Sequence, residues 1–420
     1  GNEEFIMIDD QKLVYETALE MARKSYRDGN KRVLIVKGGP GTGKSVLAIN
    51  LLVNLTNEDM VCSYVTKNAA PRNVYATKLS GDFRKTRINN LFKGSGSFVE
   101  SAENEFDVLI VDEAHRLNAK SGMFQNLGEN QIKEIIRASK FSIFFIDESQ
   151  RVTLKDIGSV EEIQKYIGQA EAESEIMELE SQFRCNGSDG YIAWIDDVLD
   201  IRKTANNDGF DLDYDIKICD TPNEVRDIIF EKNKINNKAR LLAGYCWNWI
   251  KDGKNKSNVY DITIPEYNFA MSWNLGNSQT WAIDPNSVNE IGCIHTAQGL
   301  EFDYVGVIIG NDLRYENNKI VTDVTERAKT DQSIKGIYKM FKQDFDKAEK
   351  IADEIIKNTY RTLMTRGQKG CYIYCVDKKL AEYLKKRLNK KDEIIYPVDE
   401  EEHYSSVMIA EDEEKYKYDI

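Results

Sequence analysis

The sequence of 420 residues predicts an α/β fold with two lobes, each a mostly parallel sheet with helices on both faces. Short apolar runs of strand length alternate with stretches of helical periodicity, and this alternation is typical of parallel sheets. A chain of this length also exceeds one average domain. In the first half, strands are predicted at residues 33–36, 61–65, 108–111 and 143–146.

A second set of alternating elements follows in the second half of the chain. Strands are predicted at residues 215–219, 240–245, 304–309 and 371–376, and helices at 224–232, 345–363 and 380–388. We therefore expect a first lobe over residues 1–180, a second lobe over 181–392 and an acidic C-terminal tail over 393–420. The two lobes should join near residues 178–182.

A glycine-rich loop connects the first predicted strand to a helix-like stretch at residues 46–55. It reads GGPGTGKS, and its glycines let successive backbone N–H groups point at phosphate oxygens, while the helix N-terminus adds a positive dipole end. Lys44 would reach the β- and γ-phosphates, and Ser45 would hold Mg²⁺. The motif predicts a P-loop that binds a nucleoside triphosphate through Gly38, Gly39, Pro40, Gly41, Thr42, Gly43, Lys44 and Ser45.

Two further predicted strands end in polar residues that suit phosphoryl transfer to water. The first, FDVLIVDEAH, ends in Asp112, which would hold the Mg²⁺ ion, and Glu113, which would orient and activate the water. The second, FSIFFIDESQ, places Gln150 to sense the γ-phosphate. His115 is either a link to another domain or a capping or packing group.

Several short motifs carry a resemblance to known proteins. In this order, FSIFFIDESQ, SQFR, HTAQGLEF and YRTLMTR resemble motifs of the nucleic-acid helicases of superfamily 1, and TKNAAPR from Thr66 is similar to the segment that touches the strand in that superfamily. The longer stretches IDDQK, VKGGPGTGKS, SQFRCNGSDGY and GCIHTAQGLEFDYVGVIIG are similar to the Schlafen group 3 type DNA/RNA helicase domain. The resemblance runs from about residue 5 to residue 386 and implies two RecA-like lobes.

The resemblance implies a nucleotide site that is divided between the lobes. Gln11 would read the adenine, Phe183 would stack on the base, and Glu301, two residues after Gly299 in the same motif, would meet the ribose. These contacts would favour ATP. Two alternatives stay open: Gln11 as an exposed residue at a helix start, and Phe183 as a core residue.

The resemblance also implies two arginines, Arg184 and Arg366, that approach the γ-phosphate from the second lobe. A fixed guanidinium meets the charge on phosphoryl oxygens and raises the rate by roughly a thousandfold or more. Arg361 is an alternative to Arg366, which we prefer because it belongs to the TR pair of the pattern. Because the P-loop and the arginines belong to different lobes, hydrolysis would depend on lobe closure.

The charge distribution bears on nucleic-acid binding. The formal net charge of -13 does not favour indiscriminate binding of polyanions. Between residues 67 and 93, however, lysines and arginines are opposed by Asp82 alone, whereas residues 399–402 and 411–414 are acidic. The basic span is either a solvated face or a nucleic-acid contact. We expect nucleic acid to be bound by Thr66, Lys67, Asn68, Arg72, Arg84, Arg87, His295 and Thr296.

Composition disfavours other classes of protein. Seven cysteines without a CxxC pair argue against a disulfide framework, and three histidines argue against a metal cluster beyond Mg²⁺. The sequence shows neither a signal peptide nor an apolar run of membrane-spanning length, so we expect an intracellular, cytoplasmic protein without a membrane partner. The chain opens on Gly1 instead of methionine, which leads us to expect a further domain upstream, such as a nuclease.

We therefore expect an ATP-dependent translocase or helicase of superfamily 1 type that moves on single-stranded nucleic acid, with DNA slightly preferred to RNA. The chain has little room for inserted subdomains, so strand separation would need a partner or a further domain. The alternative is an ATP-driven conformational switch that senses nucleic acid or a protein partner and gates an effector, such as a nuclease, without unwinding. A structural P-loop protein without hydrolysis is disfavoured by Glu113, Gln150, Arg184 and Arg366.

Overall fold

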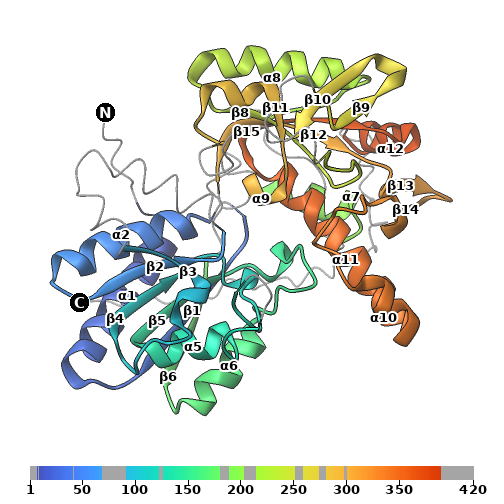
Figure 1. Cartoon of the computed structure of the whole chain (residues 1–420). Coiled ribbons are helices and arrows are strands. Elements are labelled where there is room, and N and C mark those ends of the chain that lie inside the picture. Colours follow the sequence, from blue (N-terminus) through green and yellow to red (C-terminus); the bar gives the residue numbers. More distant parts are fainter. Residues whose placement is uncertain are drawn as a thin grey trace, which may run out of the picture.

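Two α/β bodies lie side by side in the computed structural model (Figure 1). We call the body built on the six-stranded sheet the first lobe and the body built on the seven-stranded sheet the second lobe. The structure describes residues 7, 9–40, 42–68, 91–122, 126–179, 189–202, 214–250, 259–273, 281–297 and 300–388. Within these ranges, every helix is too short or too polar to cross a lipid bilayer.

The first lobe has a fully parallel sheet in the order β3-β2-β4-β5-β1-β6. Its strands are β1 (Arg32–Gly38), β2 (Cys62–Thr66), β3 (Phe92–Gly94), β4 (Phe106–Val111), β5 (Ser139–Ile146) and β6 (Glu173–Leu179). Its helices are α1 (Asp9–Asp28), α2 (Lys44–Asn57), α5 (Gln131–Ala138) and α6 (Val160–Gln169). The four strands predicted for this lobe are confirmed.

Helices cover both faces of this sheet, which explains why its inner strands β1, β4 and β5 are mostly apolar and buried. Successive side chains of a strand point to opposite faces. In β1, Val33 and Ile35 belong to the core shared with α5 and α6, whereas Leu34 and Val36 belong to the core shared with α1 and α2. Both faces of β1 are therefore anchored, and the loop that follows it starts from a fixed point.

The second lobe has a sheet in the order β7-β15-β12-β8-β11-β10-β9, parallel except for the antiparallel pair of β9 and β10. Its strands are β7 (Asp215–Ile218), β8 (Ala239–Ala243), β9 (Ile262–Ile264), β10 (Phe269–Trp273), β11 (Glu290–Gly292), β12 (Phe302–Ile309) and β15 (Gly367–Cys375). A separate hairpin pairs β13 (Leu313–Glu316) with β14 (Lys319–Thr322). The α/β fold with two mostly parallel sheets is thus confirmed.

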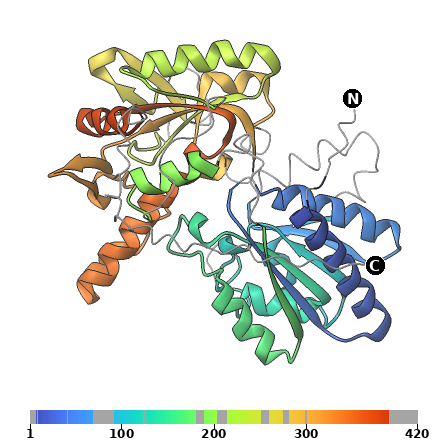
Figure 2. The same cartoon turned by 180° about the vertical axis from the view of Figure 1, so that it is seen from behind.

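The helices of the second lobe pack on both faces of its sheet. They are α7 (Asp189–Val198), α8 (Pro222–Asn236), α9 (Ile294–Ala297), α10 (Ile337–Gln343), α11 (Phe345–Met364) and α12 (Lys378–Leu388). Residues of α7, α11 and α12 share one core, and residues of α8 share the other. Seen from behind, α7 and α11 lie on the side of the second lobe that faces the first lobe (Figure 2).

Polar contacts join the two lobes at the carboxyl ends of the first-lobe strands. The backbone N–H of Leu154 donates to the carbonyl oxygen of Ser333 at 2.9 Å. The side-chain amide of Asn358 donates to the carbonyl oxygen of Arg151 at 3.1 Å, and the Arg151 guanidinium lies 3.3 Å from the Glu354 carboxylate. Ligands of open parallel sheets bind at this end of the strands, so the junction is where a functional site is expected.

Candidate nucleotide site and interlobe pocket

The P-loop joins the end of β1 to the start of α2. Gly43 precedes the helix with φ 80°, a left-handed conformation that favours glycine. The ammonium of Lys44 donates to the carbonyl oxygens of Gly38 and Gly39, both at 2.5 Å, and so lies over the loop. Ser45 follows in the first turn of α2 and is buried. A cation beside a helix N-terminus is a suitable place for the phosphates of a nucleotide.

Asp112 and Glu113 follow β4 and are both buried. The Asp112 carboxylate accepts from the Tyr64 hydroxyl at 2.6 Å and from the backbone N–H of Glu113 at 2.9 Å. Glu113 has φ 54°, in the left-handed region that is unusual for a residue with a side chain. Adjacent buried carboxylates require positive charge nearby, and carboxylate and hydroxyl oxygens are the ligands that Mg²⁺ prefers. Asp112 and Ser45 each supply an oxygen of this kind.

The residues after β5 form a hydrogen-bonded turn around Asp147. The side-chain amide of Gln150 donates to Asp147 Oδ2 at 2.6 Å, and the backbone N–H of Asp147 donates to Nδ1 of His115 at 3.3 Å. Burial raises the pKa of Asp147, but the positive charges of Lys44 and Arg361 outweigh burial and hold this pKa at about 2. Burial lowers the pKa of His115 to about 3, so this imidazole is neutral near pH 7, where its Nδ1 accepts from Asp147 within the first lobe.

Arg366, at the end of α11, contacts this turn from the second lobe. Its Nη2 donates to Gln150 Oε1 at 2.8 Å, and its Nε donates to the carbonyl oxygen of Thr362 at 3.1 Å. The side chain is buried. The predicted γ-phosphate sensor and one predicted arginine are thus in direct contact.

A cavity of about 450 Å³ lies between the lobes beside the P-loop. We call it the nucleotide cavity. Gly38, Gly39, Pro40 and Thr42 line it from the P-loop, and Asp147 and Ser149 line it from the turn after β5. Second-lobe residues complete it, and they include Asp196, Arg202 and Arg361 but not Arg366.

Two of the residues assigned to the base and sugar lie within the described residues. Gln11 is fully buried, and its side-chain amide donates to the carbonyl oxygen of Thr42 at 3.0 Å, so it is not an exposed helix-start residue. Glu301 is exposed and accepts from the Gln368 side chain at 2.5 Å, and it does not line the nucleotide cavity. Gly41, Phe183, Arg184 and Gly299 lie outside the described residues.

A second hollow, of about 290 Å³, is also lined by both lobes. We call it the interlobe pocket. Its first-lobe residues are Lys67, Asn68, Arg116, Asn118, Thr153 and Lys155, and its second-lobe residues are His295, Gln332 and Ser333. The side-chain amide of Asn68 donates to the carbonyl oxygen of His295 at 3.0 Å, which ties the two lobes together at this pocket.

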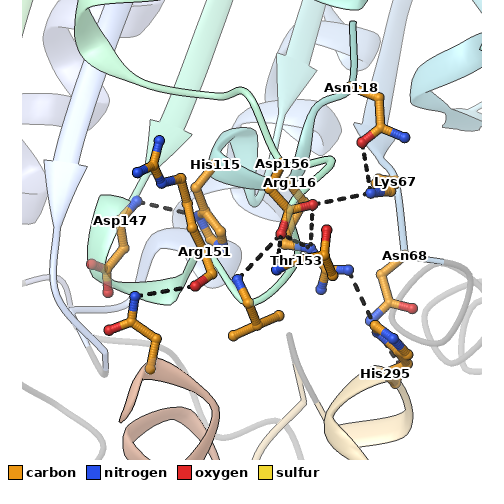
Figure 3. A network of polar contacts seen from close by, with 12 residues as sticks. Lys67, Asn68, His115, Arg116, Asn118, Asp147, Arg151, Thr153, Asp156 and His295 are labelled. Atoms are coloured by element: carbon orange, nitrogen blue, oxygen red, sulfur yellow. Dashed lines mark hydrogen bonds and ion pairs between the residues drawn. The ribbon is translucent and has the colours of Figure 1, made fainter. Parts of the chain in front are cut away.

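A buried carboxylate organises the cations of this pocket. Figure 3 shows Asp156 between Lys67 and Arg116, at 3.1 Å from the Lys67 ammonium and 3.2 Å from Nε of Arg116. Burial raises the pKa of Asp156, but Arg116 and Lys67 outweigh burial and lower it to about 2. Burial lowers the pKa of Lys67 to about 8 and that of His295 to about 3. Arg116 also lies 3.5 Å from Nδ1 of His295.

The sequence match now decides the family. The profile described as Schlafen group 3, DNA/RNA helicase domain, matches residues 31–377. The match includes the P-loop, the carboxylates after β4, and Arg361 and Arg366. The chain belongs to this family. The Schlafen group 3 resemblance expected from the motifs is therefore confirmed, and the protein is a helicase-type domain of the P-loop NTPase class.

Individual relatives and solved structures resemble this chain at low similarity. The uncharacterized protein YPL245W of Saccharomyces cerevisiae is 25% identical over 388 residues, which cover 84% of this Schlafen-type chain and 83% of the yeast protein. The Pif1 helicase from Candida albicans aligns at 15% identity with a TM-score of 0.29, over 55% of this chain and 56% of that chain. AMPPCP-bound DnaA from Aquifex aeolicus aligns at 15% identity with a TM-score of 0.25, over 47% and 53% of the two chains.

The residues expected to touch nucleic acid fall into three groups in this Schlafen-type domain. Lys67, Asn68 and His295 line the interlobe pocket. Thr66 is buried in β2, and the Thr296 hydroxyl donates to the carbonyl oxygen of Cys293 at 2.9 Å, so neither lines that pocket. Arg72, Arg84 and Arg87 lie outside the described residues.

Sequence reasoning missed several residues that the fold brings to the two sites. In the interlobe pocket they are Arg116, Lys155 and the organising Asp156, and in the nucleotide cavity they are Asp147, Asp196 and Arg202. Asp147 directly follows the strand of the FSIFFIDESQ motif, and Arg116 directly follows the FDVLIVDEAH motif. Their positions in or next to these motifs could have identified them. Asp196 and Asp156 carry no local signal, because their partners are distant in the sequence.

Proposed function

We propose that this domain hydrolyses ATP between its lobes and couples hydrolysis to movement along single-stranded nucleic acid. The observation that carries the proposal is that the nucleotide cavity and the interlobe pocket are both built from both lobes. A change in the distance between the lobes must therefore alter both at once. We place the lobe boundary near residue 180, with an acidic tail from residue 393.

The residues of the first lobe bind the triphosphate and the metal. Backbone N–H groups of the P-loop and the Lys44 ammonium bind phosphate oxygens, and Ser45 and Asp112 would hold a Mg²⁺ ion that would supply charge stabilisation at the phosphates. Glu113 orients the attacking water and accepts its proton. Asp147, which stays ionised because of Lys44 and Arg361, holds the Gln150 side chain in place.

The second lobe completes the reaction site when the lobes approach. Arg366 already contacts Gln150. We propose that Arg184 approaches the γ-phosphate in the same way. A fixed guanidinium favours the charge that develops on the phosphoryl oxygens over the charge of the bound ground state, so it raises the rate more than the affinity. Hydrolysis then depends on the position of the second lobe.

The interlobe pocket is suited to a backbone phosphate of the nucleic acid. Lys67, Arg116 and Lys155 supply positive charge, and Asp156 fixes the first two of these by direct contacts. Cations that face a phosphate fix the position of a strand without reading its bases. Binding should therefore depend on salt and only weakly on sequence.

A conformational switch is the second candidate, and the net charge of -13 favours it. In that case nucleic acid or a protein partner would set the lobe distance, and the domain would gate an effector such as a nuclease without translocating. Both candidates use the same nucleotide cavity. They differ in whether the rate of ATP hydrolysis rises with the length of the single strand.

The test is the ATPase rate with single-stranded DNA, single-stranded RNA and duplex, with the Lys44→Ala variant as the baseline. A translocase should be stimulated by single strands, more by long than by short ones. Stimulation that is independent of length supports the switch. An unmodified chain that hydrolyses ATP no faster than Lys44→Ala would end both candidates.

A matched pair of lysine variants tests the nucleic-acid pocket. Lys67 and Lys140 are 25% and 28% exposed, and each lies near a buried or nearly buried aspartate, Asp156 at 3.1 Å and Asp107 at 2.8 Å. Lys140 lies at the opposite end of the strands. Lys67→Ala should weaken binding of an unstructured oligonucleotide and reduce the salt slope by about one unit, whereas Lys140→Ala should change neither. Equal effects of the two variants would show that the nucleic acid does not bind at this pocket.

A further inference from the structure

Arg361 is a buried cation at the edge of the nucleotide cavity. Its side chain is 4% exposed, and it lines the cavity together with the P-loop. Its Nη1 donates to Ser149 Oγ at 2.9 Å, so a residue of α11 in the second lobe contacts the turn after β5 in the first lobe. A charge that is poorly screened by water acts more strongly on a nearby anion than a surface charge does.

Asp196 of α7 fixes the orientation of this guanidinium. The Asp196 carboxylate is 1% exposed, and it accepts from Nε of Arg361 and, at 3.2 Å, from Nη2. Paired contacts between a carboxylate and a guanidinium restrain the plane of the latter. With Nε and Nη2 held by Asp196, Nη1 is the group directed toward Ser149.

The position of Arg361 also differs from that of Arg366. Arg366 contacts Gln150 and, like Gln150 and Lys44, does not line the nucleotide cavity, whereas Arg361 lines it together with Gly38 and Thr42. Both arginines contact the same turn of the first lobe. They can therefore act in the same reaction, at different atoms.

We propose that Arg361 is a further catalytic residue, whose guanidinium contacts the terminal phosphates of the bound triphosphate, and that Asp196 is its positioning residue. The inference rests on the proposed ATPase function and adds a third second-lobe arginine to Arg184 and Arg366. Because Arg361 faces the cavity in the described arrangement, it should distinguish a triphosphate from a diphosphate. The second lobe then senses the state of the nucleotide through Arg361 directly.

The test uses the full chain with Arg361→Gln and Arg361→Lys. Two quantities are measured: the steady-state rate of ATP hydrolysis, and the affinities for ATPγS and ADP from the fluorescence of labelled nucleotide. Arg361→Gln should lower kcat by about a hundredfold or more and reduce the preference for ATPγS over ADP by about tenfold. Arg361→Lys should recover only a small part of either, because an ammonium cannot make paired contacts with Asp196.

Asp196→Asn tests the positioning role. It should lower kcat about tenfold with KM within about twofold, because the guanidinium remains but is no longer held. In the Arg361→Gln background the same change should cost much less, because only the contact of Asp196 with Arg202, at 2.7 Å, then remains to be lost. Equal losses in both backgrounds would overturn the positioning role, and thermal unfolding of each variant identifies losses that arise from misfolding.

Arg151→Gln is the matched control. Arg151 also joins the lobes, at 3.3 Å from Glu354, but does not line the nucleotide cavity. This control should keep the kcat and the ATPγS preference of the unmodified chain. If Arg361→Gln keeps both as well, the inference is wrong while the ATPase function stands. If the unmodified chain binds neither nucleotide, the proposed function fails and the inference fails with it.

Discussion

Arg366 in the second lobe donates from Nη2 to Oε1 of Gln150 in the first lobe at 2.8 Å. Gln150 in turn donates to Asp147 at 2.6 Å, so a buried chain of hydrogen bonds runs from one lobe into the other. Buried polar networks are stable only when each member keeps its partners. A displacement of the second lobe must therefore disturb the turn that follows β5.

We expect Arg366→Ala to lower the turnover of ATP by roughly a hundredfold or more while changing ATP affinity by much less. The reason is that the lost interaction strengthens as charge develops on the phosphoryl oxygens. Steady-state rates and nucleotide titrations separate the two effects. A loss of affinity as large as the loss of rate would assign Arg366 to ground-state binding instead.

Substitutions of Lys44 and Glu113 should impair ATP hydrolysis in different ways. Lys44→Ala removes a phosphate contact, so both binding and turnover should weaken. Glu113→Gln leaves the phosphate contacts intact and removes the group that accepts a proton from water, so binding should be retained and turnover lost. The measurement is a nucleotide titration beside a steady-state rate for each variant. Near-normal turnover in Glu113→Gln would exclude that residue as the base.

Nucleic-acid binding should weaken as the pH rises through about 8. Burial lowers the pKa of Lys67 to about 8, so this ammonium is charged at pH 7 and mostly neutral at pH 9. The loss of one linked proton can reduce affinity by at most about tenfold per pH unit. Lys67→Arg keeps its charge throughout and should flatten the dependence. Fluorescence anisotropy of an oligonucleotide from pH 7 to 9 measures it, and the same slope in both proteins would exclude Lys67 as its source.

Gly158→Ala should destabilise the first lobe and slow hydrolysis. A Cβ atom at Gly158 would lie 1.9 Å from the carbonyl oxygen of Ala114, so the turn that carries Glu113 would have to move. The cost should be about 1–3 kcal/mol. Gly168→Ala is the control, because nothing lies within 4 Å of the added atom and the position is in α6. The apparent unfolding temperature should fall for Gly158→Ala and rise slightly for Gly168→Ala.

The strands with long apolar runs were predictable because burial on both faces leaves no polar alternation. β1, β4, β5 and β12 belong to this class, and the helices α2, α8, α11 and α12 followed from periodicity. The strands β3, β9, β10 and β11 were missed, since three to five residues carry too short a pattern. β6 was missed because it is a charged and mostly exposed strand. The hairpin of β13 and β14 was also not predicted, because its strands have only four residues each.

Site residues were predictable where they belong to one contiguous motif. They were not predictable where two residues distant in the sequence meet only through the fold. The P-loop and the pair Asp112 and Glu113 are local patterns. Asp196 and Arg361, in contrast, are separated by 165 positions and meet only in the folded chain. Arg361 lies in the last turn of α11 and Arg366 lies just beyond the end of this helix, so spacing alone could not tell which of the two faces the cavity.

The left-handed backbone at Glu113 offers a way to sort relatives of this domain. Holding a glutamate at φ 54° costs about 1–2 kcal/mol compared with glycine, and asparagine tolerates the conformation better too. A relative that no longer hydrolyses nucleotide would gain stability if glycine or asparagine replaced this glutamate, and it would lose no activity. Glutamate at this position in a relative should thus mark a working hydrolase, and glycine or asparagine should mark a pseudoenzyme.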